Sequence, residues 1–283
     1  MTASIFNGKI RDGKPGTLTA EDFDVLYDDE KKYAYLSPVP VIDYSGDEYR
    51  KLVNSSELIE DYFKMHDAQQ PGYFSFISPY FKRGMRVADC GCGGGAMLDL
   101  LKGLAADTVA IEPFEGYHES LSARNHKVYG SVESAVSDGL ASTVDLAISL
   151  HVIEHTTDPL AYLKDIYDLL KPGGTAVVFT PNLHDILLDI YPEVYAPFFF
   201  RKVHNYYFSG ESLALLGTQA GFVKADVVCY HEFGLSNTML WLRDGKAKGQ
   251  NAIPGIDKKI DGSWRAYLEE NGKGYNIGVI LTK

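Results

Sequence analysis

The segment VADCGCGGGA, which begins at Val87, constrains the fold of this chain more than any other stretch of its sequence. Its glycines alternate with small residues directly after the apolar run MRVADC. Glycine permits tight turns in which the backbone can approach a ligand closely. A strand, such a loop and the start of a helix form the usual ligand cradle of an open parallel sheet. The sequence therefore predicts a nucleotide-like ligand at this loop.

Strands and helices are predicted to alternate from this loop onward. Strands are expected at the apolar runs MRVADC, DTVAIEP, HKVYGS, VDLAISL, TAVVFTPN, KADVVCYHEFG and YNIGVILTK. Helices are expected at AMLDLLKGL, at YHESLSARN, from Asp158-Pro159 to KPGG, and from Ser209 to Ala220. The core runs lack polar alternation, as is typical of strands covered on both faces. The pattern predicts an α/β fold with a doubly wound, mostly parallel seven-stranded sheet.

Two parts of the chain do not follow this alternation. Residues 1–80 are predicted to form an N-terminal extension with lid helices. Thr19 followed by AED resembles a helix start. The run from Ser55 to Phe81 has apolar residues at helical spacing, broken at Pro71-Gly72. The main domain, residues 81–283, would carry two insertions. The aromatic insertion 183–208 is predicted to form a lid that covers an acceptor pocket, and an added core patch or a homodimer contact is the alternative. The insertion 243–274 is rich in Gly and Lys.

Composition narrows the class of partner. The formal net charge of −11 and a pI near 5.2 argue against a nucleic-acid groove, which needs clustered Lys and Arg, and favour a small-molecule acceptor. Three cysteines provide neither a disulfide framework nor a thiolate zinc site, so we expect reduced packing residues. No apolar run is long enough to span a bilayer and the start lacks a signal peptide, which predicts a cytoplasmic protein without a membrane partner.

The glycine loop also matches a dinucleotide pattern. Gly91, Gly93 and Ala96 satisfy G-x-G-x-x-A, and Glu112 lies at a suitable distance to accept hydrogen bonds from a ribose diol. Asp89, however, places a carboxylate at the mouth of the first strand, where it would repel a pyrophosphate but suit an ammonium group. Gly95 extends the glycine alternation, and only one α/β unit is visible to hold two ligands. These features favour a cationic donor over a nicotinamide dinucleotide.

Four motifs in order resemble the class I S-adenosylmethionine-dependent methyltransferases. They are VADCGCGGG, VAIEP, DLAISLHVIEHTTDP and LKPGGTAVVFTPN, over roughly residues 80–230. The resemblance implies a Rossmann-like methyltransferase fold with S-adenosyl-L-methionine as cofactor.

The resemblance also implies a role for each matching position. Asp89 and the backbone of Gly91, Gly93 and Gly95 would hold the methionine moiety, and Glu112 would take the ribose hydroxyls. The remaining expected cofactor contacts are Pro113 beside the ribose, Val132 and Glu133 near the adenine, and Leu150 and His151 at the sulfonium. For Glu133 an ordinary carboxylate in the first turn of a helix is the alternative.

The segment HVIEH, residues 151–155, formally matches the zinc motif H-x-x-E-H. That motif needs both histidines on one helical face, whereas a strand precedes His151 and the next helix begins at Asp158, so no metal is predicted. A hydroxyl acceptor benefits from a general base, most often His. His155 and His204 are the candidate catalytic bases, with a structural hydrogen bond or lid packing as their alternatives, and His66 is a weaker candidate.

The leading hypothesis is methyl transfer from S-adenosyl-L-methionine to a small molecule, at a hydroxyl of a sugar or secondary metabolite. An N- or C-methyltransferase is the near alternative. A non-catalytic S-adenosylmethionine-binding partner protein and a nicotinamide dehydrogenase are the others.

Overall fold

The computed structural model of the 283-residue chain describes residues 1–13, 16–46, 49–50, 59–246, 248–249 and 251–283. It divides into two compact units, each built from three chain segments. The N-terminal unit comprises Met1–Pro40, Thr180–Leu213 and Val227–Gly278. The parallel-sheet unit comprises Val41–Phe179, Ala214–Asp226 and Val279–Lys283. Residues 41–80, which the sequence analysis assigned to the extension, thus group with the parallel sheet.

The large sheet confirms the predicted α/β class. Its seven strands have the order β10-β11-β8-β7-β4-β5-β6. In chain order they are β4 (Arg86–Cys90), β5 (Asp107–Ile111), β6 (Lys127–Tyr129), β7 (Val144–Leu150), β8 (Leu170–Pro181), β10 (Lys224–Tyr230) and β11 (Asn276–Thr282). The ladders that join β4 to β5, β4 to β7, β5 to β6 and β7 to β8 are parallel. The carboxyl ends of β4, β5 and β7 therefore meet at one edge of the sheet.

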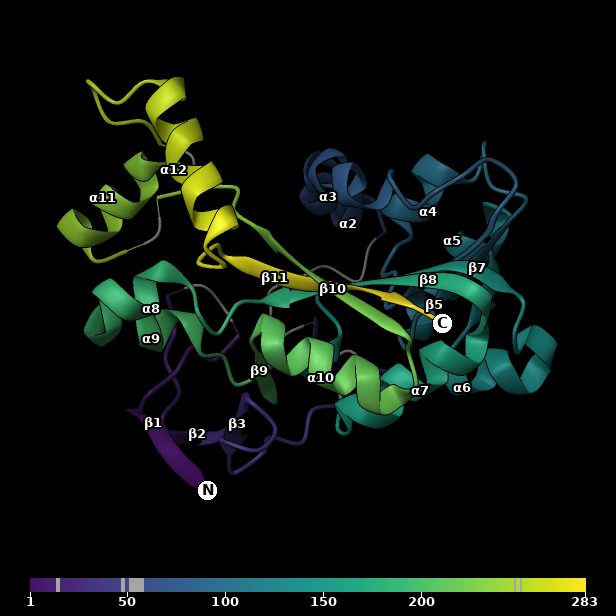
Figure 1. Cartoon of the computed structure of the whole chain (residues 1–283), viewed down its shortest axis with the longest axis horizontal. Helices are drawn as coiled ribbons and strands as arrows, with labels where there is room; N and C mark the ends of the chain where they lie inside the picture. Colours follow the sequence, from purple (N-terminus) through teal and green to yellow (C-terminus); the bar gives the residue numbers. More distant parts are fainter. Residues whose placement is uncertain (14–15, 47–48, 51–58, 247, 250) are drawn as a thin grey trace. The chain divides into compact units, whose positions relative to one another are not determined.

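Helices follow the strands as expected. The expected ones are α4 (Ala96–Leu101), α5 (His118–Ala123), α7 (Pro159–Leu169) and α10 (Gly210–Ala220), and the short α6 (Val132–Ala135) is additional. Asp158 caps α7 by accepting hydrogen bonds from the amides of Leu160 and Ala161, both at 3.0 Å. Figure 1 shows α3 and α4 on one side of the parallel sheet and α6 and α7 on the other. β8 begins at Leu170, before KPGG, whereas the sequence predicted a strand only after KPGG. Backbone hydrogen bonds of Gly173 and Gly174 with Lys283 hold this segment as part of the strand.

Helices are present within residues 59–77 of the run for which the sequence predicts lid helices, and their role as a lid stays a prediction. They are α2 (Ile59–His66), a short 3₁₀ turn η1 (Asp67–Gln69) and α3 (Gln70–Ile77). The break predicted at Pro71-Gly72 is displaced, since Pro71 lies in the first turn of α3, where its missing N–H costs no hydrogen bond. Residues 55–58 of the predicted helical run lie outside the described residues.

The helix predicted after Thr19 is wrong. This part of the chain forms β1 (Thr2–Gly8), β2 (Phe23–Asp28) and β3 (Tyr33–Ser37), which pair with β9 (Tyr206–Phe208) in the order β1-β2-β3-β9. The hydroxyl of Thr19 accepts a hydrogen bond from the amide of Ile10 at 3.1 Å and so fixes a loop instead of capping a helix. Phe23 and Val25 alternate with partly exposed neighbours, which is the period of a half-buried strand.

Both predicted insertions lie in the N-terminal unit. The aromatic insertion 183–208 forms α8 (Ile186–Ile190), α9 (Pro192–Phe199) and β9. Tyr195, Phe199, Phe200 and Tyr207 are buried in a core cluster that belongs wholly to this unit. These rings therefore form an added core patch, and a lid function for the insertion stays a prediction. The later insertion contains the end of α11 (Leu235–Asp244) and α12 (Lys258–Glu270), a helix that the sequence analysis did not predict.

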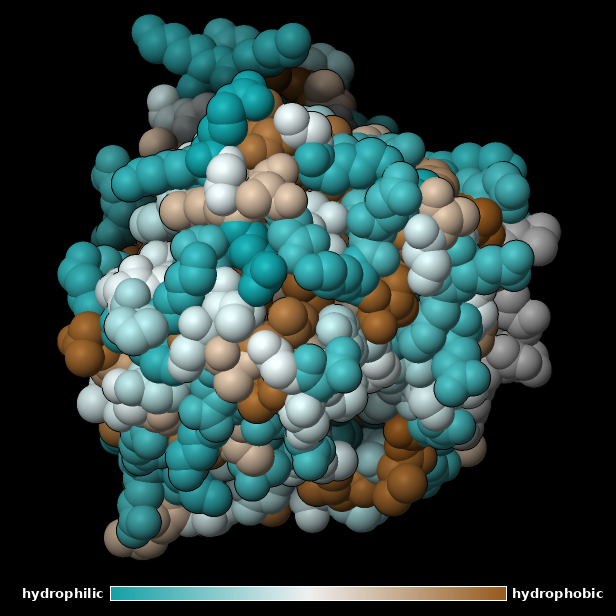
Figure 2. All heavy atoms as spheres, turned by 90° about the vertical axis from the view of Figure 1, so that its right-hand side faces the viewer, coloured by the Kyte–Doolittle hydropathy of each residue, from teal (hydrophilic) through white to brown (hydrophobic). Residues whose placement is uncertain are grey.

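The surface is polar on the face drawn in Figure 2, with hydrophobic side chains in small separate groups. Among the described residues, no helix has both the length and the apolar composition needed to cross a membrane. Cys90 and Cys92 are buried free thiols, in agreement with their predicted packing role.

Candidate active site

The glycine loop follows β4 and requires glycine at three positions. Gly91, Gly93 and Gly95 have φ angles of +81°, +54° and +85°, which other L residues rarely adopt. A Cβ atom at Gly91 would lie 2.4 Å from Val152 Cγ2, and one at Gly93 would lie 2.6 Å from the ring of Tyr62. The loop is therefore both turned tightly and packed tightly, and α4 begins directly after it.

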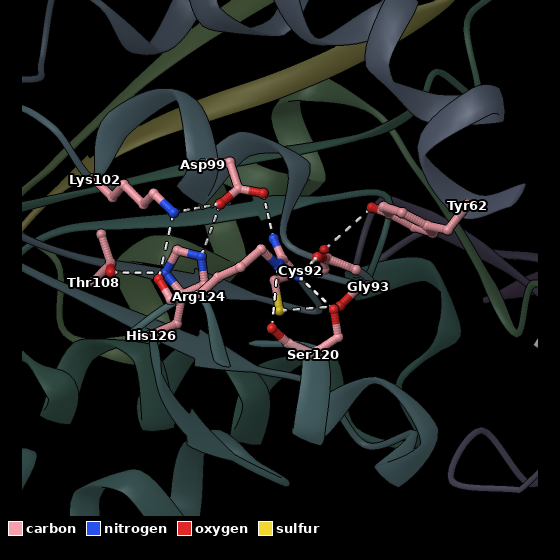
Figure 3. Close-up of polar contacts among 10 residues, drawn as sticks. Tyr62, Cys92, Gly93, Asp99, Lys102, Thr108, Ser120, Arg124 and His126 are labelled. Carbon is pink, nitrogen blue, oxygen red and sulfur yellow. Dashed lines mark hydrogen bonds and ion pairs between the residues drawn. The ribbon is translucent and has the colours of Figure 1, made fainter. Parts of the chain in front are cut away.

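A polar network beneath the loop holds it in place, as Figure 3 shows. The guanidinium of Arg124 donates hydrogen bonds to the carbonyl oxygen of Gly94 and to the carboxylate of Asp99. Asp99 also contacts Lys102 at 3.3 Å and His126 Nε2 at 3.2 Å. Arg124 was not singled out from the sequence, since it lies 30 positions from the carbonyl that it binds.

The predicted methionine-binding acid, Asp89, lies near the end of β4 and is 5% exposed. Burial, together with the negative charge of Glu112, raises the pKa of Asp89 to about 7. Within the described part of the chain no opposite charge or hydrogen bond offsets this shift. A buried carboxylate in this condition favours a ligand that brings a positive charge.

Glu112, the predicted ribose acid, follows β5 and is also 5% exposed. Its Oε2 accepts the amide of Gly93 at 2.8 Å, and its Oε1 accepts the amide of Phe114 at 2.9 Å and Arg50 Nη2 at 3.0 Å. Burial raises the pKa of Glu112, while Arg50 and the two amides act in the opposite direction. The acid thus ties the tip of β5 to the glycine loop. A diol that binds Glu112 would donate to the same carboxylate oxygens as Arg50, or would displace the guanidinium from them.

Two aromatic residues hold the guanidinium of Arg50. It lies 4.2 Å from the ring centroid of Phe114 and 4.4 Å from that of Tyr117. No sequence motif indicated this residue, because its partner Glu112 is 62 positions away.

Tyr62 of α2 covers the loop from above. Its ring lies against the open sides of Gly93 and Gly94, and its hydroxyl donates to the carbonyl oxygen of Cys92 at 3.2 Å. Burial raises the pKa of Tyr62 well above the ordinary range, so the phenol is neutral. His66 stacks on the same ring, with centroids 4.3 Å apart. The weaker base candidate His66 is therefore part of the cover of the loop.

The other predicted cofactor contacts occupy varied environments. Val132 is buried at the start of α6, while Glu133 beside it is exposed, as the alternative of an ordinary first-turn carboxylate expects. Pro113 is exposed, and Leu150 ends β7 in a partly exposed position.

The turn after β7 brings a buried acid and two histidines together. His151 Nε2 lies 3.0 Å from the hydroxyl of Tyr73, and His151 Nδ1 lies 3.5 Å from Glu154 Oε1. Glu154 is 1% exposed. Burial alone would raise the pKa of Glu154, but the contact with His151 and the charge of His155 outweigh it, and the net shift is downward. Glu154 was passed over from the sequence as part of a rejected zinc motif.

The two predicted bases lie in different units. His155 ends a 3₁₀ turn, η4 (Ile153–His155), and its ring lies 5.3 Å from that of Tyr44 and 5.6 Å from that of Tyr49. His151 and His155 do not share an α-helical face, in line with the geometry argued from the sequence. His204 is buried in the N-terminal unit before β9, with its ring 5.9 Å from that of Tyr207.

A glycine loop after the first strand, a buried acid at the next strand and a doubly wound sheet are the features of a class I S-adenosylmethionine-dependent methyltransferase. A sequence model of a family described as a methyltransferase domain matches residues 66–227, more than half of the chain. The chain belongs to this methyltransferase family. The predicted class, enzyme type and S-adenosylmethionine cofactor are thereby confirmed at the level of the family.

Individual relatives show how far the similarity reaches. A ubiquinone biosynthesis O-methyltransferase of Ruegeria pomeroyi is 35% identical over 106 residues, which cover 35% of this chain and 42% of that protein. The match thus spans less than half the length of this curated relative.

Two solved structures support the fold. A SAM-dependent methyltransferase from Archaeoglobus fulgidus has a TM-score of 0.54 at 19% identity and covers 83% of this chain and 98% of its own. A phosphoethanolamine N-methyltransferase of Haemonchus contortus, solved with S-adenosylmethionine, has a TM-score of 0.52 at 13% identity. The match covers 86% of this chain and 60% of that chain. At these identities the likeness concerns the fold alone. The roles of individual residues stay predictions.

Proposed function

We propose that this protein transfers the methyl group of S-adenosylmethionine to a hydroxyl oxygen of a small molecule, such as a sugar or a secondary metabolite. The observation that carries the proposal is the buried, uncompensated carboxylate of Asp89 beside the glycine loop. An ammonium group would supply the missing charge, whereas a pyrophosphate would be repelled. The name of the O-methyltransferase relative supports oxygen as the methylated atom.

S-adenosylmethionine, when bound, supplies a methyl group already activated by a positively charged sulfur. The tasks left to this chain are binding, alignment and exclusion of water. Asp89 and the loop from Gly91 to Gly95 would bind the amino-acid end, and Glu112 would bind the ribose. Tyr62 and its helix α2 would shield the loop from solvent, because the Tyr62 ring lies against Gly93 and Gly94.

Ligand binding comes first in the test of this proposal. Thermal shift is measured with S-adenosylmethionine, its demethylated product S-adenosylhomocysteine, and NAD. The proposal expects stabilisation by the first two; preferential stabilisation by NAD would indicate a dehydrogenase instead.

A methyl-transfer screen over sugars, phenols and amines with labelled S-adenosylmethionine follows. Label on oxygen of the product is the expected result. Label on nitrogen or carbon would replace the proposal by its near alternative, an N- or C-methyltransferase. Binding without turnover on any acceptor would favour a non-catalytic binding protein.

A further inference from the structure

A chain of three polar side chains leads from α3 to the turn after β7. The hydroxyl of Tyr73 lies 3.0 Å from Nε2 of His151, and Nδ1 of His151 lies 3.5 Å from Oε1 of Glu154. The two rings meet edge to face, with centroids 5.8 Å apart and an interplanar angle of 67°. Each nitrogen of the imidazole thus faces an oxygen, a phenol on one side and a buried carboxylate on the other. We call these residues the Tyr73–His151–Glu154 chain.

His151 adjoins the glycine loop. The side chain of Val152, the next residue, lies so close to Gly91 that a Cβ there would be 2.4 Å away. β7 pairs with β4 so that Ile148 lies opposite Asp89. The His151 side chain is nevertheless 28% exposed. An acceptor can therefore reach the imidazole next to the loop that would hold the methyl donor.

The backbone at His151 is strained. Its φ of +58° lies in the left-handed region, which costs a residue other than glycine on the order of 1 kcal/mol. The amide of His151 donates to the carbonyl oxygen of Phe179 at 2.8 Å, which helps to hold this conformation. Strain of this kind persists where the surroundings fix a side chain in one direction, and here it directs the imidazole between Tyr73 and Glu154.

Resting on the proposed transfer to oxygen, we propose that His151 is the general base for a phenolic hydroxyl of the acceptor, and that Glu154 is its positioning residue. The hydroxyl of Tyr73 marks the place on Nε2 that the acceptor hydroxyl takes. A phenol is the chemistry that the chain itself presents to this nitrogen. Phe76 lies three residues after Tyr73 in α3, is partly exposed and packs on the buried ring of Phe179, so its ring also suits a flat aromatic acceptor.

The transfer step balances with these groups. A bond forms between the acceptor oxygen and the methyl carbon while the carbon–sulfur bond breaks, and its electron pair stays on sulfur. The proton of the acceptor hydroxyl moves to Nε2 of His151 and later to solvent. The products are an aryl methyl ether, a neutral thioether and a proton. Glu154 stabilises the positive imidazolium, as a buried carboxylate does in other His-assisted reactions.

The test uses the full chain and compares His151→Asn with wild type. Asn tolerates the left-handed backbone and has no basic nitrogen. The probes are catechol, whose hydroxyls are neutral at the assay pH, and 4-nitrocatechol, which is already ionised there. We expect kcat on catechol to fall about a hundredfold or more in His151→Asn, and kcat on 4-nitrocatechol to fall less than about tenfold. Affinity for S-adenosylmethionine, measured by calorimetry, separates this role from the sulfonium contact that the sequence resemblance implies for His151: as a base alone, its loss should change the affinity less than about twofold.

Three further variants separate a catalytic from a structural role. Glu154→Gln should lower kcat on catechol about tenfold and spare 4-nitrocatechol. Tyr73→Phe removes the hydroxyl that competes for Nε2, so any loss of kcat on catechol should be far smaller than the loss in His151→Asn. His184→Asn is the matched control, because His184 lies in the N-terminal unit in a turn after β8, and it should match wild type.

Several results would overturn the proposal. Equal losses on both phenols in His151→Asn would mean a structural role, and an unchanged rate on catechol would exclude His151 as base. A loss in Tyr73→Phe as large as that in His151→Asn would assign the essential hydroxyl to Tyr73. Wild type that methylates sugars or amines but no phenol would refute the acceptor class and leave methyl transfer standing. Absence of S-adenosylmethionine binding in wild type would refute the proposed function itself.

Discussion

The parallel sheet carries two buried acid sites at the same edge, and they differ in how their charge is balanced. At the ends of β4 and β5, Arg50 pairs with Glu112 but no such partner is recorded for Asp89 among the described residues, and burial raises the pKa values of both carboxyls. After β7, Glu154 is as deeply buried, but His151 and His155 hold its pKa below the ordinary value. In the first region the carboxyl of Asp89 has no counter-charge among the described residues, so it suits a cationic ligand. The second contains its own proton carriers and suits proton transfer.

Neutralising the two acids should have opposite consequences for stability. Asp89→Asn removes an uncompensated buried charge, so the ligand-free protein should keep or raise its Tm. Glu154→Gln removes the partner of two histidines, so Tm should fall. Affinity for S-adenosylmethionine should fall by two to three orders of magnitude in Asp89→Asn, about 3–4 kcal/mol, because the ammonium would lose its counter-charge.

Calorimetry and thermal unfolding of the two variants provide the check. Affinity retained within about threefold in Asp89→Asn would remove the basis for the cofactor assignment. A Tm that falls equally in both variants would show that the two regions do not differ in charge balance.

Arg50 is the cation that pairs with the buried carboxylate of Glu112. Arg50→Met keeps the contact with Phe114 and Tyr117 but leaves Glu112 without its partner. Breaking a buried pair in this way costs about 3 kcal/mol of unfolding free energy. Lys64→Met is the matched control in α2, since Lys64 pairs with Asp61 at 2.7 Å but is 74% exposed, and its loss should leave the free energy of unfolding nearly unchanged. Chemical unfolding of both variants measures the difference, and equal effects would mean that Arg50 does not neutralise Glu112.

The pH dependence of binding sharpens the same contrast. Asp89 must be ionised to hold an ammonium, and its pKa is raised to about 7. Affinity for S-adenosylmethionine should therefore fall as pH drops from 7 to 5, approaching about tenfold per pH unit. Asp89→Asn should lose this acid limb, whereas Glu154→Gln should keep it. Titration calorimetry at several pH values tests this, and a limb that survives in Asp89→Asn must belong to another group.

The stability of the ligand-free protein should respond to pH in opposite senses at the two sites. The folded pKa of Asp89 is raised above its unfolded value of 3.8, so its stabilising contribution is complete below that value and is lost as pH rises through about 7. The folded pKa of Glu154 is lowered from 4.5, so its contribution is present above that value and is lost as pH falls through the folded pKa. The difference in Tm between each variant and wild type, followed from about pH 3 to about pH 8, separates the two.

The sequence predicted the parts of this molecule that depend on local pattern. The apolar runs at β4, β5 and β7 identified buried parallel strands, and the cap at Asp158 placed the start of α7. The glycines at 91, 93 and 95 indicated the tight loop, since their positive φ angles follow from local geometry. β2 was missed because Thr19 followed by two acids resembles a helix start, and this outweighed the short alternation in FDVLY. Only pairing with β1 and β3 decides for a strand.

The contacts that define the site depend on pairing at a distance. Arg50 meets Glu112 across 62 positions, and Tyr73 meets His151 across 78. No spacing rule encodes such pairs, because they arise only when the sheet has brought the strand ends together. Glu154 shows the same limit: its charge was visible, but its burial between two histidines was not.

Removing one hydroxyl from each region is the mildest way to compare them. Tyr62 donates to the carbonyl oxygen of Cys92 in the glycine loop, whereas Tyr73 meets His151 after β7. Tyr62→Phe keeps the ring against Gly93 and should weaken S-adenosylmethionine binding by about 1 kcal/mol, near fivefold. Tyr73→Phe should leave that affinity unchanged, since its hydroxyl belongs to the acceptor side. Both variants make the same chemical change, one in α2 and one in α3. Equal losses of cofactor affinity would therefore mean that the two helices form one cover and do not serve two distinct regions.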